Sequence, residues 1–161
     1  MFDNELFSRT SEIINENLLA ILSKLGFREM PENLSLKISQ EYGQAYGLCL
    51  ALFKDEHRSQ LLEAVVVLYP SNMLWLKVFD WLHLPRLCMF SRRLFKRRVL
   101  HVLAHELRHF WQYYSGEHRE YHRLSQFLPR SMRLVELDAD RWAEDYLLVY
   151  GANPRLAGLS M

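Results

Sequence analysis

The chain is poor in cysteine, glycine and proline, and it lacks any long hydrophobic run. Its 161 residues contain two cysteines, Cys49 and Cys88, too few for a disulfide framework or a cage of metal-binding thiolates. Glycine and proline together make about 7% of the chain, against roughly 12% in average proteins, which argues against disorder. No stretch approaches the roughly 18 continuous apolar residues of a membrane span. The first thirty residues carry Asp3, Glu5, Glu12 and Glu16 among their apolar positions and do not resemble a secretion signal. We therefore expect a cytoplasmic protein with no membrane partner.

An excess of charge of one sign is also missing. Lys+Arg 20 and Asp+Glu 19 leave a formal net charge of +1, which argues against a chain that binds polyanions with its whole surface. The charges are nevertheless uneven, because no acidic residue lies between Trp81 and Ala104. The basic residues of this part of the chain are Arg86, Arg92, Arg93, Lys96, Arg97 and Arg98. They could bind nucleic acid, but a solvated helix face explains them as well, and we do not favour nucleic acid as a partner.

Hydrophobic periodicity predicts a single α+β domain over residues 1–161, in which a helix is followed by strands and then by further helices. The predicted strands would form a mixed sheet of three or four strands. Residues 80–90 show no clear period and are expected to be irregular. The predicted helices run from Thr10 or Ser11 to Gly26, from Ser91 to about Tyr114, over His118–Phe127, and from Met132, capped by Ser131, to about Tyr150. The predicted strands are Leu34–Ser39, Tyr46–Phe53, Ala64–Tyr69 and Met73–Phe79, with a turn at residues 70–72.

The most informative motif is H-E-x-x-H at residues 105–109, on the second predicted helix. Residues four apart on an α-helix are separated by about 40° around the axis and about 6 Å along it. His105 and His109 can therefore direct imidazole nitrogens to one metal ion. Glu106 projects beside this pair, where it can accept a proton from water without binding the metal itself.

A catalytic zinc ion usually has three protein ligands and one open position, so a third ligand is expected elsewhere. Glu136 and Asp140 lie 27 and 31 residues after His109 and share one face of the last predicted helix. One carboxylate of this pair could complete the coordination, while the other could accept the N–H of a ligating histidine. Asp138 lies between them, and we interpret it as an acidic residue favoured by the helix dipole alone.

The combination of H-E-L-R-H at 105–109 with Glu136-x-x-x-Asp140 resembles the gluzincin metallopeptidases, in particular their minimal intracellular members related to the ImmA/IrrE group. Gln112, Ala139 and Ala143 also fit the pattern of these small forms. The resemblance covers about a third of the chain. It implies a small zincin-like fold, with zinc bound by His105, His109 and Glu136. It also implies that Glu106 is the general base and proton shuttle and that Asp140 supports a histidine ligand.

Members of this family usually supply a further donor that stabilises the oxyanion, but no position here matches it. Tyr113, Tyr114, Tyr121, His118 and Tyr146 are candidates. In such folds a peptide substrate pairs with the strand at the rim of the cleft, and we expect Met73–Phe79 to be that strand.

Other families of HExxH proteases use a histidine as the third ligand. A metzincin would need a histidine at position 115, which is serine here, so that class is excluded. SprT-like proteases also use a later histidine, and His118 or His122 could take that role. His101 is expected near the site without binding the metal, and His57 and His83 are expected to be structural.

Three functions follow from these residues. The favoured one is a zinc metallopeptidase that cleaves a specific protein or peptide substrate, whose identity the sequence does not indicate. The second is a zinc-containing pseudo-protease that acts as a binding module. The third is a DNA-associated protein, either a SprT-like protease or one with a vestigial site.

Overall fold

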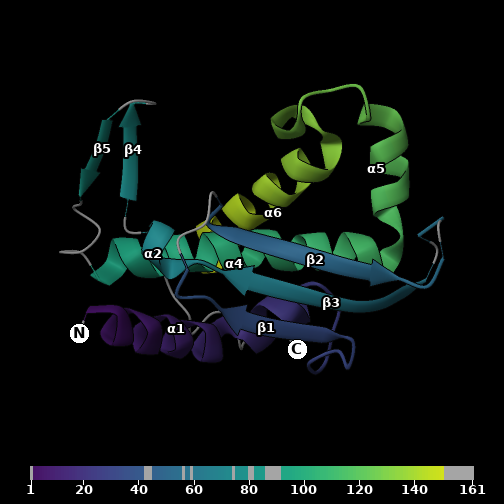
Figure 1. Ribbon diagram of the computed structural model, residues 1–161. Helices are drawn as coiled ribbons and strands as arrows, with labels where there is room; N and C mark the ends of the chain where they lie inside the picture. The colour runs from purple at the N-terminus through teal and green to yellow at the C-terminus, as the bar shows by residue number, and fades with distance from the viewer. Residues whose placement is uncertain are drawn as a thin grey trace.

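The computed structural model describes residues 2–41, 45–55, 57–58, 60–73, 75–79, 82–85 and 92–150, and within them the fold is α+β, as predicted (Figure 1). Two sheets are present, one of three strands and one of two. The helices are α1 (Phe2–Lys24), α2 (Pro70–Met73), α4 (Arg92–Ser115), α5 (Glu117–Ser125) and α6 (Leu134–Tyr150), with a 3₁₀ turn at Arg130–Met132. The strands are β1 (Leu34–Ile38), β2 (Gly47–Phe53), β3 (Leu61–Leu68), β4 (Trp75–Phe79) and β5 (Leu82–Pro85).

The three-stranded sheet is mixed and has the order β1-β3-β2. β1 lies parallel to β3, with Leu34 opposite Ala64, and β2 lies antiparallel to β3, with Gly47 opposite Leu68. On the central strand, Ala64, Val66 and Leu68 are fully buried. This alternation places one face of the sheet against the core. Among the described residues, no strand pairs with the outer edge of β2.

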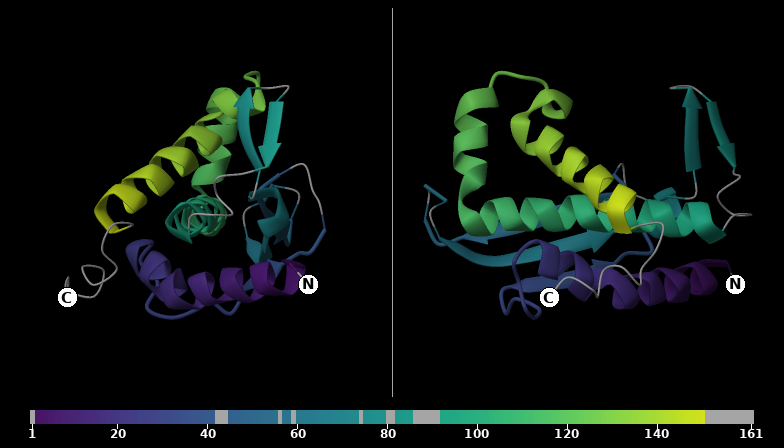
Figure 2. Two further views of the ribbon diagram at one scale, coloured as in Figure 1. Left: turned by 90° about the vertical axis from the view of Figure 1, so that its left-hand side faces the viewer. Right: turned by 180° about the vertical axis from the view of Figure 1, so that it is seen from behind.

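α4 is the central helix of the fold. It packs on β2 and β3, α1 packs along it, and α6 crosses it on the side away from α1 (Figures 1 and 2). The core between them contains Phe95, Leu103, Leu107 and Phe110 of α4, which are almost completely buried. No described helix is both long enough and apolar enough to cross a membrane.

The first helix begins earlier than the sequence predicted. We expected Thr10 or Ser11 to cap it, but α1 already starts at Phe2. The Oγ1 of Thr10 donates a hydrogen bond to the carbonyl oxygen of Leu6 at 2.8 Å, and Thr10 is fully buried. A threonine hydroxyl can bond to the preceding turn in this way from inside a helix. The predicted end is confirmed, because Gly26 has a φ of 93°, which glycine adopts readily.

The expectation that Met73–Phe79 forms the rim of the main sheet is wrong. β4 pairs antiparallel with β5 in a separate hairpin, which projects from the end of the molecule where α4 begins (Figures 1 and 2). Leu82–Pro85 therefore forms a strand inside a segment that we expected to be irregular. The edge strand beside the H-E-x-x-H helix is instead β2.

α6 begins at Leu134, two residues later than predicted, because Arg133 is extended, with φ −69° and ψ 139°. The hydroxyl oxygen of Ser125, at the end of α5, accepts the N–H of Leu134 at 3.2 Å. A side chain from α5 thus binds one of the unpaired N–H groups at the start of α6. This contact helps to place Glu136 in the first turn of α6, opposite α4.

Candidate metal centre

α4 and α6 bring together the three residues that the sequence proposed as metal ligands. The Nε2 atoms of His105 and His109 lie 3.0 Å apart. Oε2 of Glu136 lies 3.7 Å from Nε2 of His105 and 3.5 Å from Nε2 of His109. Among the described residues, this is the group of potential ligands whose atoms are close enough to hold one metal ion. Neither His118 nor His122 belongs to it, so the geometry favours Glu136 as the third member.

Each histidine is held by a hydrogen bond at its other nitrogen. Nδ1 of His105 lies 2.8 Å from Oδ1 of Asp140, and Nδ1 of His109 lies 2.9 Å from Oε1 of Gln112. The amide nitrogen of Gln112 donates to the main-chain oxygen of Val135 at 3.0 Å and to Asp138. The amide oxygen therefore faces His109 and accepts from it. Both Nδ1 atoms carry the proton, which leaves the lone pairs of both Nε2 atoms directed toward Glu136.

Asp138 has a larger role than the helix-dipole effect to which the sequence analysis assigned it. Its Oδ2 accepts hydrogen bonds at 2.7 Å from Nε2 of Gln112 and at 2.7 Å from Nε of Arg108. Arg108 also contacts Glu117 of α5 at 3.3 Å. Asp138 thus anchors the amide that orients His109. No sequence spacing indicated this link, because Gln112 and Asp138 are 26 residues apart.

Glu106 is buried, with 7% of its surface exposed, between α4 and the start of β2. A Cβ atom on Gly47 would lie 2.8 Å from Cγ of Glu106 and 2.6 Å from Cγ1 of Val102. These separations are shorter than van der Waals contact, so only glycine allows β2 to approach the helix this closely at this point. The sequence alone did not single out Gly47 as a site residue. Its only sign there is a glycine near the start of a predicted strand.

The charges of the cluster shift several pKa values. Burial raises the pKa of Glu106, as expected for a carboxylate beside apolar side chains. The contacts that its carboxylate makes with His105 and His109 hold the pKa of Glu136 well below its usual range. Burial lowers the pKa of His105, but the adjacent carboxylate of Glu136 and the charges of Glu106 and Asp140 outweigh it, so the net shift is upward. The centre therefore has a negative environment that favours a bound cation.

The donor set fits a divalent metal ion. Atoms placed tetrahedrally about 2.0–2.2 Å from zinc lie roughly 3.3–3.6 Å from one another. The three donor atoms here are separated by 3.0, 3.5 and 3.7 Å. Without a cation, two imidazole lone pairs and a carboxylate oxygen would face each other at repulsive distances. His105, His109 and Glu136 together could thus hold a metal ion.

A pocket of about 710 Å³ opens beside Glu136, on the side of α5. We call it the basic pocket. Its lining includes Arg58, Arg119, Arg130, Arg133, His118 and Glu136. Of the candidate oxyanion donors, Tyr113 and His118 line it, whereas Tyr114, Tyr121 and Tyr146 do not. The ring of Tyr113 is stacked on that of His109, with 6.5 Å between the centroids, so Tyr113 is in ring contact with a proposed metal ligand.

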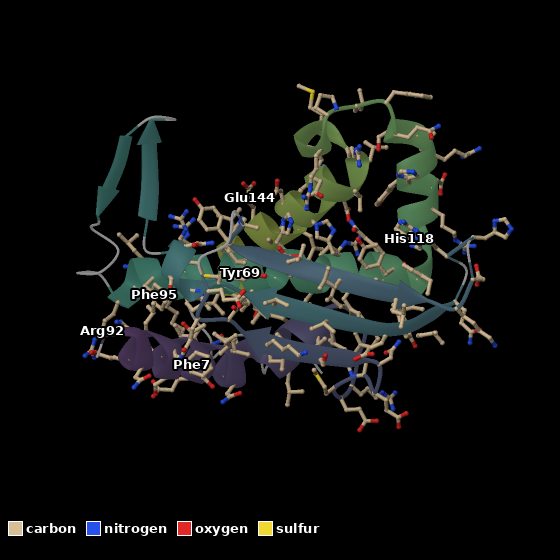
Figure 3. The ribbon with its side chains drawn as sticks, in the orientation of Figure 1. Phe7, Tyr69, Arg92, Phe95, His118 and Glu144 are labelled. Carbon is tan, nitrogen blue, oxygen red and sulfur yellow. The ribbon has the colours of Figure 1, made fainter. Side chains whose placement is uncertain are left out.

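The remaining histidines whose side chains the structure describes are not members of the candidate ligand group. His101 lines a second cavity, of about 640 Å³, together with Arg97, Arg98 and Glu144. Figure 3 shows His118 of the basic pocket near the end of α4, and Glu144 of the second cavity nearer the middle of that helix. His57 is exposed and also lines the basic pocket. His83 lies in β5.

Three of the basic residues of α4 contact side chains of other parts of the described structure or face them across a cavity. Nζ of Lys96 binds Oε2 of Glu16 in α1 at 2.8 Å, and Arg98 lies over the ring of Tyr46 at 4.4 Å. Arg97 and Arg98 face the acidic part of α6 across the second cavity, through Glu144. Arg86 and Cys88 lie outside the described residues.

Comparison of the chain with protein-family models, with curated proteins and with solved structures finds no match. The functional argument therefore depends on the geometry of the site itself.

Proposed function

We propose that this protein is a zincin-like, zinc-dependent metallopeptidase of the gluzincin type. The observation that carries the proposal is the convergence of two Nε2 lone pairs and one carboxylate oxygen, each histidine being fixed by an acceptor at Nδ1. Two histidines and a glutamate with an open fourth position are typical of catalytic zinc in peptidases, whereas structural zinc sites are usually closed by four protein ligands.

His105, His109 and Glu136 would hold the ion, while Asp140 and Gln112 keep the imidazoles in the required tautomer and orientation. Bound zinc would supply Lewis-acid chemistry, lowering the pKa of a water ligand and polarising a carbonyl group. Glu106 would take up the proton of the attacking water and transfer it to the leaving amine. Its raised pKa suits this exchange, because a general base works best with a pKa near the working pH.

The edge of β2 supports a peptide as the substrate. β2 packs on α4, and its first residue, Gly47, lies against Glu106. An extended peptide could add to this edge as a further strand, which would place one of its carbonyl groups over the centre. β2 therefore takes the role that the sequence analysis gave to Met73–Phe79.

The test combines metal analysis with substrate-independent detection of cleavage. The purified protein should contain about one zinc ion per chain. It should cleave members of a mixed peptide library, as detected by mass spectrometry of new termini. Glu106→Gln is the matched variant, because it preserves shape and removes only the base. We expect it to retain zinc and to lose nearly all cleavage. Equal cleavage by Glu106→Gln and the parent protein would contradict the proposal.

A further inference from the structure

The basic pocket has a charge that its own residues do not neutralise. Four arginines line it, and Glu136 is the one carboxylate among the lining residues. Arg130 donates through Nε to Oε1 of Glu136 at 3.2 Å. Among the described residues, Arg58, Arg119 and Arg133 form no ion pair with a carboxylate. Positive charge therefore gathers around one space, beside the proposed metal ligand.

Two of these arginines are already partly positioned. The guanidinium of Arg58 lies over the ring of Phe53, 5.9 Å from its centroid, at the end of β2. Nε of Arg133 donates to the main-chain oxygen of Leu128 at 3.2 Å, which leaves its terminal N–H groups for another acceptor. A guanidinium offers N–H groups in a planar fork that matches the two oxygens of a carboxylate.

His118 provides an independent sign of a ligand. It is 5% exposed, it lines the basic pocket, and its ring contacts Phe53 and Tyr113. Its Nδ1 lies 3.1 Å from the main-chain oxygen of Gln112, which can only accept, so Nδ1 carries the proton. Nε2 is then a buried acceptor, and no described atom bonds to it. Buried polar atoms normally have partners, so an N–H or O–H group of a ligand is the expected partner here.

We propose that the basic pocket is a subsite that binds a carboxylate group of the peptide substrate, so that peptides with an acidic group near the cleaved bond are preferred. The proposal rests on the proposed peptidase function. The arginines would bind the carboxylate, and Nε2 of His118 would accept a peptide N–H. A peptide fits better than a nucleic acid, because the arginines converge on one pocket, whereas nucleic-acid phosphates form an extended row.

Two sources of the carboxylate, an acidic side chain and the free C-terminus, can be separated with matched peptides. One set replaces a single Gln by Glu at each successive position, and a second set compares a free C-terminal acid with its amide. Dissociation constants are measured by fluorescence anisotropy on zinc-loaded Glu106→Gln protein, which binds without cleaving. In parallel, kcat/KM is measured on the parent protein.

We expect one Glu position, or the free C-terminus, to improve binding by roughly tenfold over its uncharged counterpart, as charge-assisted hydrogen bonds do. Arg58→Glu combined with Arg119→Glu should abolish this preference and favour Lys at the same position. Both side chains are exposed, so these changes should not unfold the protein, which circular dichroism can verify. Arg123→Glu is the control, because it reverses the charge of one exposed arginine of α5 that does not line the pocket.

The outcomes separate the two proposals. Cleavage without any preference for acidic groups would overturn the subsite and leave the peptidase function intact. A preference in binding without cleavage of any peptide would retain the subsite and overturn the peptidase function. Tight binding of a short single-stranded DNA, with no discrimination between Glu and Gln peptides, would also overturn the subsite. So would equal loss of preference in the Arg123→Glu control.

Discussion

The two sides of Glu136 differ in how their polar groups are paired. On the side of α4, the Nδ1 atom of each proposed histidine ligand has an acceptor, in a series from Asp138 through Gln112 to His109 and from Asp140 to His105. On the side of α5, Arg58 and Arg119 have no carboxylate partner among the described residues, and Nε2 of His118 has no hydrogen bond. On the first side, the proposed ligands are already held in position to bind a small cation. On the second side, polar groups are unpaired and could bind a larger ligand.

The comparison implies different sensitivities to mutation. In a connected network of buried groups, removal of one member leaves its partner unpaired and displaces a ligand. In an open cluster of exposed arginines, one removal changes only the local charge. The metal centre should behave as a connected network, so that single substitutions in it have large effects.

The largest effect is expected from Glu136→Ala, which removes the carboxylate of the proposed ligand set. The parent protein should be stabilised by zinc, by about 2.7 kcal/mol when free zinc is one hundred times the dissociation constant. The variant should show almost no stabilisation by zinc in thermal unfolding. His118→Ala is the control, since His118 lies outside the ligand group. If His118→Ala lost zinc while Glu136→Ala retained it, the ligand assignment would be wrong.

An intermediate effect is expected from Gly47→Ala. The new Cβ would lie 2.6 Å from Cγ1 of Val102 and 2.8 Å from Cγ of Glu106, so β2 or Glu106 must move. Overpacking of this kind costs about 1–3 kcal/mol of folding free energy. Displacement of the base by about 1 Å can reduce cleavage roughly a hundredfold.

Zinc affinity should change much less in Gly47→Ala, because the atoms nearest to the new Cβ belong to Val102 and Glu106, which are not proposed ligands. Urea unfolding, zinc titration and kcat/KM together separate these effects. Leu50→Ala on the same strand is the control, because Leu50 is 52% exposed. Unchanged cleavage in Gly47→Ala would show that β2 does not position Glu106.

The features that the sequence predicted well are local ones. The spacing of His105 and His109, and that of Glu136 and Asp140, depends only on the period of an α-helix. Both pairs therefore lie on the faces expected of them, and the periodic helices and strands agree with the prediction to within a few residues, apart from the start of α1.

The features that the sequence could not predict depend on the arrangement of distant segments. Which strand lies beside α4 depends on the order of the strands in the sheet, and the sequence patterns of β2 and β4 do not contain that order. The contact between Gln112 and Asp138 requires two helices to pack at one particular register. The basic pocket draws Arg58, Arg119 and Arg133 from three separate segments, so no window of sequence contains it.

The smallest effect is expected from a matched pair of substitutions on α6, Asp140→Asn and Asp138→Asn. Asp140 touches a proposed ligand directly, through Nδ1 of His105, whereas Asp138 acts on His109 only through Gln112. Loss of a group that supports a metal ligand typically weakens metal binding about 10–100-fold, and we expect Asp140→Asn to fall in this range. Asp138→Asn leaves both proposed histidine ligands with their direct acceptors, Asp140 and Gln112, so its effect on zinc affinity should be only severalfold. Competition with a chelator measures both affinities. A larger loss in Asp138→Asn than in Asp140→Asn would mean that His109, held through the Gln112 amide, depends on its support more strongly than His105 does.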